Sequence, residues 1–517
     1  MDCLSQKFKR NKKWLFLSLL AVFLWGILAH GYGFMHDSFS HDSLNEFNGA
    51  NGGNAWKIQL GRFVIPVYKA VFRTDLTLPL LVGILSLLWI GLAVFLVIRI
   101  FKIESKVLVF LIAGIFTANI TVAATSATYM HDFDCDMFAL LCSVLAMYFW
   151  RNVRRGGLLG AIFVAISLGI YQSYLAVTIV LVMFVCILDL LNGEKFKSVF
   201  CKGLKAVGMI LLGGGIYFAA MQVVLAFTGL ELASGDYNSL GNLLELTPRS
   251  ILSLTYCAYL DCYARLVSMI SPYPAVLVKG SVWLMFLAAA AAVLAGLWNK
   301  RMGVLEKLLC IALVVLLPLG MNLIYILAGG EVHDLMVYAV WLFYLLVLLL
   351  LDWLGKHCNG KSKPLSGLCM VLIFVLLYGN VQTANALYLK KDMEQDAFLS
   401  LMTRVVYKME ECDEYEPGQT PVVFVGNSDQ LNGSISGFEK YSEITGAWDA
   451  ETANMTEDFR CRTYFQYVLN NPALIASGSV WEGMQTDSRV SEMPCYPSDG
   501  CIAMIDGVLV VKLGSNS

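Results

Sequence analysis

Eleven long apolar segments constrain the fold of this chain more than any other feature of its sequence. A helix needs about 20 apolar residues to cross the hydrocarbon core of a bilayer. The candidate segments are 14–33, 77–98, 107–126, 137–150, 157–173, 174–191, 204–228, 274–298, 304–328, 335–353 and 365–384. Hydrophobic residues make up 58% of the chain and charged residues 15%, against about 45–50% and about 25% in soluble domains. The sequence therefore predicts an all-α polytopic membrane protein with about eleven transmembrane helices.

Charge placement predicts the orientation of these helices. Basic residues cluster before the first segment and in alternate connections, at 7–13, 99–106, 151–155, 195–205, 300–307 and 356–363. Because loops rich in lysine and arginine stay in the cytoplasm, we expect a cytoplasmic N-terminus and an extracytoplasmic C-terminal region. The first segment has no cleavage site of small residues and should be retained. The overall net charge of −2 offers no basic field for nucleic acid.

Acids and histidines gather in the loops expected on the outer face. They lie in "HDSFSHDSLNE" (36–46), "TYMHDFDCDMF" (128–138) and "GGEVHD" (329–334). The candidate acids are Asp37, Asp42, Glu46, Asp132, Asp134 and Asp136, and His41, His131 and His333 each precede an aspartate. Two interpretations stay open: solvated loop acids, or carboxylates that supply a general base. Metal binding is compatible with these residues, but their spacing does not demand it.

The first outer loop also carries a predicted helix with a basic edge. In 55–73, apolar residues recur at helical spacing, while Arg62, Lys69 and Arg73 share another stripe. Such a helix lies in the membrane interface. Its cations either anchor lipid headgroups or bind a substrate phosphate, for which the planar guanidinium of Arg62 is well suited.

A second large outer loop, 229–273, contains a predicted helix that begins at Thr247 and Pro248. Tyr256, Tyr259 and Tyr263 share one face of it, and Asp261 pairs with Arg265 at i, i+4. The tyrosines form either an interfacial belt or a surface for a sugar or prenyl chain. Arg249 and Arg265 are further candidates for phosphate binding.

The composition changes after about residue 385. "PVVFVG" (421–426) is typical of a buried strand, and Asp506-Gly507 between two apolar runs predicts a hairpin. We expect residues 385–517 to form a small extracytoplasmic α/β accessory domain after a membrane domain at 1–384. If the domain lies outside the cytoplasm, its cysteines are able to form disulfides. They are Cys412, Cys461, Cys495 and Cys501.

Several stretches, in this order, resemble the Gtr-type bacterial glucosyl transferases, the serotype-converting O-antigen glucosyltransferase family. They are "YGFMHDSFSHDSLNEF", "WKIQLGRFVIPVYKAVF", "TYMHDFDCDMFALLCSVLAMY", "VHDLMVYAV" and "MPCYPSDGCIAMIDGVLVVKL". The resemblance implies a GT-C architecture and a polyprenyl-phosphate sugar donor on the outer leaflet of a bacterial plasma membrane. It implies Asp42 as the general base, with Asp37 and Glu46 as rivals. Asp132 and Asp134 match the acidic pair of the second loop, and Arg62 matches the arginine of "GRF".

The residues and the resemblance together predict a membrane hexosyltransferase that moves glucose to a surface polysaccharide. Candidate substrate-binding residues are Arg62, His41, His131, Tyr129, Arg249, Arg265 and His333. We expect either no cofactor or Mg²⁺ or Mn²⁺. The alternatives are a flippase for lipid-linked sugar, a non-enzymatic membrane anchor, and a GT-C enzyme with another sugar or with a protein or teichoic-acid acceptor.

Overall fold

The computed structural model describes residues 2–36, 39–40, 43, 50–233, 247–298, 302–357, 362–427, 435–447 and 457–514. The chain divides into two compact units. The larger unit comprises Met1–Met35, Asn54–Ser126 and Asp132–Asn385. The smaller unit comprises His36–Gly53, Ala127–His131 and Ala386–Ser517, so it joins parts of two predicted outer loops to the C-terminal region.

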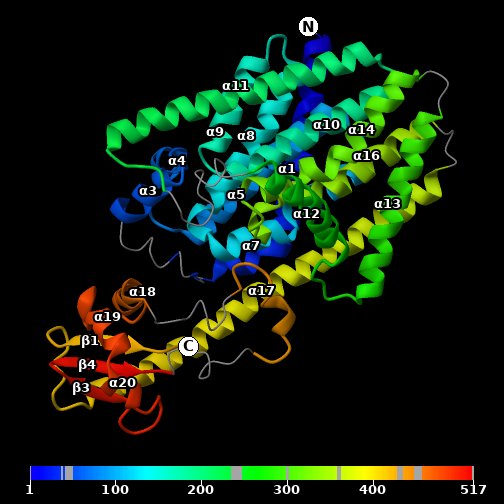
Figure 1. Cartoon of the computed structure of the whole chain (residues 1–517). Helices are drawn as coiled ribbons and strands as arrows, with labels where there is room; N and C mark the ends of the chain where they lie inside the picture. Colours follow the sequence, from blue (N-terminus) through cyan, green and yellow to red (C-terminus); the bar gives the residue numbers. More distant parts are fainter. Residues whose placement is uncertain are drawn as a thin grey trace. The chain divides into compact units, whose positions relative to one another are not determined.

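Ten helices in the described part of the chain are long and apolar enough to cross a membrane (Figure 1). They contain α1 (Asp2–Met35), α5 (Pro79–Phe101), α6 (Lys106–Thr117) with α7 (Ile120–Thr128), α8 (Phe133–Asn152), α10 (Leu175–Leu191), α11 (Phe196–Thr228), α13 (Ala275–Leu297), α14 (Val304–Met321), α16 (Leu342–His357) and α17 (Lys363–Glu410). The eleventh predicted segment, 157–173, differs: its helix α9 (Gly157–Leu168) has only 12 residues. The predicted polytopic helical fold is confirmed.

One predicted span is interrupted where α6 ends and α7 begins, around Ala118. An interruption inside a membrane leaves backbone carbonyls that need other hydrogen-bond donors. Tyr338 Oη donates to Phe116 O at 2.6 Å, and Asn380 Nδ2 donates to Ala118 O at 3.0 Å. The ring of His30, fully buried in α1, lies 2.9 Å from Thr117 O. Side chains from three other elements therefore stabilise the break.

The loop after α1, which is predicted to face outward, contains two short helices instead of the single one expected for 55–73. These are α3 (Ala50–Gln59) and α4 (Val64–Phe72), and Gly61 between them has a φ of +76°. Glycine adopts this left-handed conformation without a steric penalty, so the chain turns here. Because of this turn, α3 and α4 have different axes, and their side chains do not follow the single periodicity of one continuous helix.

The predicted helix of the second outer loop is confirmed as α12 (Pro248–Val267). Thr247 caps it through a reciprocal pair of hydrogen bonds with Ser250, and Pro248 occupies its first turn. Short helical segments follow α14: α15 (Leu323–Leu327), and 3-10 turns at Asp334–Met336 and Tyr338–Trp341.

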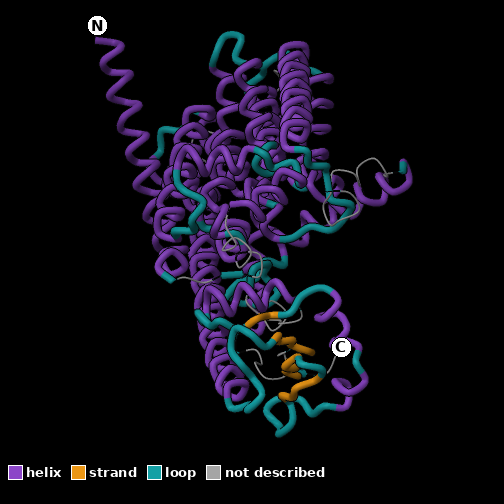
Figure 2. The backbone as a smooth tube through the Cα atoms, turned by 90° about the vertical axis from the view of Figure 1, so that its left-hand side faces the viewer, coloured by secondary structure: helices purple, strands orange, loops and turns teal. Residues whose placement is uncertain are grey.

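The smaller unit contains a four-stranded sheet in the order β2-β1-β4-β3 (Figure 2, strands in orange). The strands are β1 (Pro421–Val425), β2 (Leu474–Ile475), β3 (Ile502–Ile505) and β4 (Val508–Lys512). β1 is parallel to β2 and β4, while β3 and β4 form the predicted hairpin, in which Ile505 pairs with Val508. Helices α18 (Asp458–Thr463), α19 (Ser479–Thr486) and α20 (Ser488–Glu492) complete the unit.

The C-terminal end of α17 supplies one side of the core of the smaller unit. Phe398, Met402 and Val405 of this helix are buried in one cluster with the side chains of β1 and β4. Cys412, Cys461, Cys495 and Cys501, which were candidates for disulfides, are all free thiols. Apolar packing therefore stabilises the core of the smaller unit.

Candidate functional site

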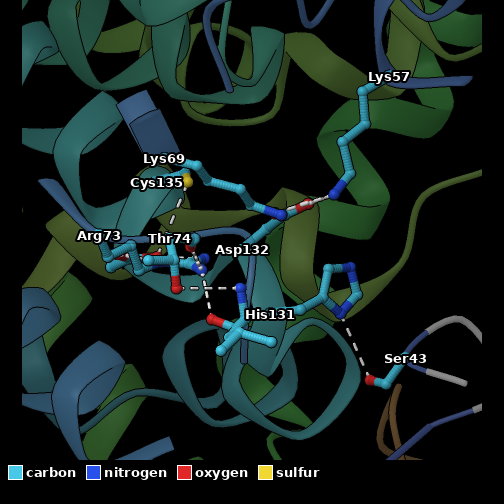
Figure 3. Close-up of polar contacts among 10 residues, drawn as sticks. Ser43, Lys57, Lys69, Arg73, Thr74, His131, Asp132 and Cys135 are labelled. Atoms are coloured by element: carbon cyan, nitrogen blue, oxygen red, sulfur yellow. Dashed lines mark hydrogen bonds and ion pairs between the residues drawn. The ribbon is translucent and has the colours of Figure 1, made fainter. Parts of the chain in front are cut away.

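The first element of the site is a carboxylate shared by two lysines. Asp132 precedes α8, and its Oδ2 lies 2.8 Å from Lys57 Nζ of α3. Its Oδ1 lies 2.8 Å from Lys69 Nζ of α4. Figure 3 shows both ammonium groups converging on this carboxylate. All three side chains are buried, so their mutual attraction is screened far less than it would be at a surface.

The second element is a bidentate ion pair in the first turn of α8. Arg73, at the end of α4, donates from Nε to Asp134 Oδ2 at 2.9 Å and from Nη2 to Oδ1 at 3.2 Å. Its Nη1 donates to the carbonyl oxygens of Thr74 and Leu76. The pKa of Arg73 is raised: burial opposes the charge, but the attraction of Asp134 and the hydrogen bonds to it outweigh burial. Arg73 thus connects α4 and the residues that follow it to α8.

The third acid of the series, Asp136, has a different environment. It is 5% exposed, and its carboxylate makes no hydrogen bond or ion pair with any other residue that the structure describes. It lies within electrostatic range of Arg62 and Lys57. It also interacts electrostatically with Tyr174, whose buried hydroxyl has no hydrogen-bond partner among the described residues. Buried polar groups are normally satisfied, so this pair calls for an explanation.

Arg62 lies in the turn between α3 and α4. Its guanidinium carbon is 4.5 Å from the centre of the Tyr171 ring, a cation–π contact. The turn is fixed from outside, because Tyr217 Oη of α11 donates to Gly61 O and Gln172 Nε2 donates to Leu60 O, each at 3.2 Å. The arginine is therefore positioned by a rigid turn and an aromatic face.

These contacts define a cationic cluster in the larger unit. Its cations are Lys57, Arg62, Lys69 and Arg73, and its carboxylates are Asp132, Asp134 and Asp136. Among the residues that the structure describes, the cluster thus brings four cations together with three carboxylates. The acids also lie at the start of α8, where the helix dipole favours negative charge. Such a site is able to hold an anionic group such as a phosphate beside a carboxylate.

His131 and Tyr129, two predicted substrate-binding residues, belong to the smaller unit. His131 is buried, with Nδ1 3.4 Å from Ser43 Oγ (Figure 3), and its ring meets that of Tyr129 edge to face. In the same unit, Ser40 Oγ donates to Thr128 O at 2.5 Å, and Lys391 of α17 donates to Ala127 O. Parts of both predicted outer loops are thus fastened to the C-terminal unit.

Three other predicted residues lie outside the cationic cluster. Arg265 pairs with Asp261, as predicted, at 2.7 Å, and also with Asp334 at 2.9 Å. It donates to Val332 O as well, so it joins α12 to the loop before α16. His333 and Arg249 are exposed. The structure therefore gives Arg265 a connecting role within the larger unit.

The predicted acids of the first outer loop, Asp37, Asp42 and Glu46, lie outside the described residues, as does His41. Within the described ranges, no group of three or more histidine, cysteine, aspartate or glutamate side chains could hold a metal ion. Asp132 and Asp134 are instead occupied by lysine and arginine nitrogens. The described part of the site therefore does not fit Mg²⁺ or Mn²⁺, which need several free oxygen ligands.

The sequence analysis named Asp136 only as one of six candidate acids and assigned no function to Lys57 or Tyr174. A signal for Lys57 was present: it is one of the few cations on a face where basic residues are otherwise scarce. No sequence signal marks Tyr174, which lies in a 3-10 turn before α10. Its relation to Asp136 becomes visible only when α8 and α10 are packed together.

Comparison with known proteins identifies the family to which this chain belongs. A family model described as glucosyl transferase GtrII matches residues 31–350, more than half of the chain. The match includes α3, α4 and the start of α8, and thus every residue of the cationic cluster. No curated protein and no solved structure matches the chain. This multi-pass membrane protein therefore belongs to the GtrII family of glucosyl transferases.

Proposed function

We propose that this glucosyltransferase takes glucose from a polyprenyl-phosphate donor and transfers it to a cell-surface glycan on the outer face of a bacterial plasma membrane. The observation that supports the proposal is the gathering of Lys57, Arg62 and Lys69 near the start of α8, where Lys57 and Lys69 are buried and Arg62 is half-buried. A donor with a lipid tail in the bilayer would place its phosphate near the end of a membrane span, where these cations lie.

The reaction is a displacement at the anomeric carbon of the sugar. The acceptor hydroxyl oxygen forms a bond to this carbon while the bond from the carbon to the phosphate oxygen breaks. The hydroxyl proton passes to a carboxylate, and the polyprenyl phosphate leaves with one more negative charge. Cations fixed before the reaction stabilise this developing charge without having to reorganise.

Each cation has a distinct part in this proposal. Arg73 is held by Asp134 and two carbonyls, so it fixes α4 to α8 as a positioning residue. Lys57 and Lys69 share the carboxylate of Asp132, and both ammonium groups are proposed to attract the donor phosphate. Arg62, stacked on Tyr171, presents a planar guanidinium suited to a phosphate.

The carboxylates also have distinct parts in this proposal. Asp132 and Asp134, predicted as catalytic, are buried in ion pairs with lysine and arginine side chains. We assign them positioning roles. Asp42 stays the proposed general base, with Asp37 and Glu46 as rivals. Asp136 and Tyr174, buried without hydrogen-bond partners among the described residues, are proposed to bind hydroxyl groups of the transferred sugar.

For the smaller unit we propose a role in binding the acceptor. It holds Ser40 and Ser43 of the first outer loop and Thr128 and His131 of the second in one compact body with the C-terminal sheet. The C-terminal region, expected as an accessory domain at 385–517, would thereby influence the loop that carries the proposed base.

The test has two parts. Mass spectrometry of cell-envelope glycans, with and without the protein, should reveal a hexose that depends on it; unchanged glycans would contradict the proposed acceptor. In a transfer assay with purified protein and polyprenyl-phosphate glucose, Asp42→Asn should lower turnover by about 10²–10⁴-fold, the usual contribution of a general base. Normal turnover by folded Asp42→Asn would remove this residue from the role.

The flippase alternative predicts a different result. A flippase moves the lipid-linked sugar across the bilayer but leaves the sugar–phosphate bond intact. Reconstituted protein would then translocate a fluorescent donor analogue and release no free polyprenyl phosphate. The family match favours glycosyl transfer, and production of polyprenyl phosphate with an acceptor present is the outcome we expect.

A further inference from the structure

An apolar groove lies between α10, α11 and α14, remote in sequence from the cationic cluster. It has a volume of about 420 Å³, within the range of about 300–1,000 Å³ typical of ligand pockets. All its lining residues are apolar; among them are Ile179 and Cys186 of α10, Val199, Gly203 and Val207 of α11, and Leu309 of α14. Because the three helices are candidate membrane spans, the occupant of this groove must be compatible with hydrocarbon.

One end of the groove adjoins a network of ion pairs. Asp189, three residues after the groove residue Cys186, accepts from Arg151 at 3.1 Å and from Lys202 at 2.8 Å. Lys202 also pairs with Glu194 at 2.6 Å and precedes the groove residue Gly203. Charged side chains therefore lie at this end of the apolar groove.

The same end has an excess of positive charge. The beginnings of α11 and α14 lie together there, because Phe196 N donates to Glu306 Oε1 at 3.0 Å. The side chains on these segments and the ends of α8 and α10 include six cations and three carboxylates. The cations are Arg151, Lys195, Lys197, Lys202, Lys205 and Lys307, and the carboxylates are Asp189, Glu194 and Glu306. An apolar groove with a cationic end matches a lipid with an anionic headgroup.

We propose that this groove binds an anionic glycerophospholipid of the surrounding bilayer. One acyl chain lies along the apolar side chains of α10, α11 and α14, and the headgroup phosphate meets the lysines at the start of α11. Charge complementarity selects this occupant over a zwitterionic lipid, for which the lysines would offer no net attraction. The site is independent of the proposed sugar transfer, and it would stabilise α11, only seven of whose 33 residues are buried hydrophobic residues or glycine.

Two glycines of α11 make a matched test of the groove. Gly203 lines it and Gly208 does not, and a Cβ at either position would meet no atom within 4 Å. Gly203→Leu should therefore fill the groove without a clash, while Gly208→Leu adds the same side chain to the same helix elsewhere. Native mass spectrometry of the full chain, mixed with phosphatidylglycerol or phosphatidylcholine, measures the lipid retained.

We expect wild type and Gly208→Leu to retain phosphatidylglycerol in preference to phosphatidylcholine, and Gly203→Leu to weaken this retention about tenfold, equivalent to about 1.4 kcal/mol. Lys197→Gln with Lys205→Gln should reduce the preference between the two lipids, since both lysines are exposed. Equal retention of the two lipids, or equal loss in both glycine variants, would overturn the proposal. So would retention of undecaprenyl phosphate without phosphatidylglycerol, or a Gly203→Leu variant that changes only the oligomeric state.

Discussion

Arg73 and Asp134 form a two-pronged ion pair, with nitrogen–oxygen distances of 2.9 and 3.2 Å and both side chains buried. The residues are 61 positions apart in the sequence. Their pairing fastens the end of α4 to the first turn of α8. The same connection brings Lys69 of α4 to Asp132, so the Arg73–Asp134 pair contributes to the position of Lys69.

Breaking this pair on one side should destabilise the protein strongly. Arg73→Met leaves the carboxylate of Asp134 buried without its partner, which we expect to lower the free energy of unfolding by about 3–5 kcal/mol. Thermal unfolding in detergent measures the change. Arg73→Met combined with Asp134→Leu should recover much of the loss, because no buried charge is then left unpaired. A double variant no more stable than Arg73→Met alone would contradict this explanation.

Removing Lys57 should affect the donor more than the fold. Asp132 keeps Lys69 as a partner at 2.8 Å, so its buried charge stays paired, but the cluster loses one of the cations proposed to attract the donor phosphate. For Lys57→Gln we expect a KM for polyprenyl-phosphate glucose at least about tenfold higher, since hydrogen bonds to charged groups contribute about 1.5–3 kcal/mol. Lys279→Gln, at an exposed position of α13, is the matched control. Equal KM values for the two variants would remove Lys57 from phosphate binding.

Asp136 and Tyr174 distinguish a binding role from a structural one. Tyr174→Phe deletes a buried hydroxyl that has no partner among the described residues, so it should leave the unfolding temperature unchanged or higher. If the hydroxyl binds sugar, the same variant should lower kcat/KM for transfer about tenfold. Asp136→Asn keeps the shape and should act in the same direction. Full activity in both variants would indicate that the pair does not contact the substrate.

A pH effect is expected in the smaller unit. Arg489 donates to Asp487 at 2.8 Å and to Asp506 at 2.6 Å, and these hydrogen bonds and the positive charge lower the pKa of both carboxyl groups. A lowered pKa in the folded state gives stability that is present above the unfolded value of about 3.9 and is lost as the pH falls through the folded value.

Hydrogen-exchange protection of Ile502–Lys512 in the full chain should therefore decrease as the pH falls below about 4. Arg489→Gln should be less protected at neutral pH and should change less on acidification, because its carboxyl groups titrate near their ordinary values in both states. Parallel pH profiles for wild type and Arg489→Gln would show that the cluster does not contribute to stability.

Local sequence patterns were sufficient for much of the architecture. Ten of the eleven predicted spans lie in helices of crossing length, and α12 begins at the predicted Thr247 and Pro248. Asp506-Gly507 forms the predicted turn between β3 and β4. These features depend on residues that are neighbours in the chain, so hydrophobic runs, caps and turn residues identify them directly. The single helix predicted for 55–73 was wrong, because Gly61 permits a turn that periodicity alone does not reveal.

The sequence by itself determined that this chain spans a membrane, where most of its long helices lie and that acids and rare cations share the loops predicted to face outward. Only the tertiary structure decided which of these charges meet. It pairs Asp132 with Lys57 and Lys69, pairs Arg73 with Asp134, and leaves the buried Asp136 and the Tyr174 hydroxyl without a hydrogen bond among the described residues. The physical reason is that helix formation depends on residues a few positions apart, whereas a buried charge interacts with whatever packing brings within a few ångströms, however distant in sequence.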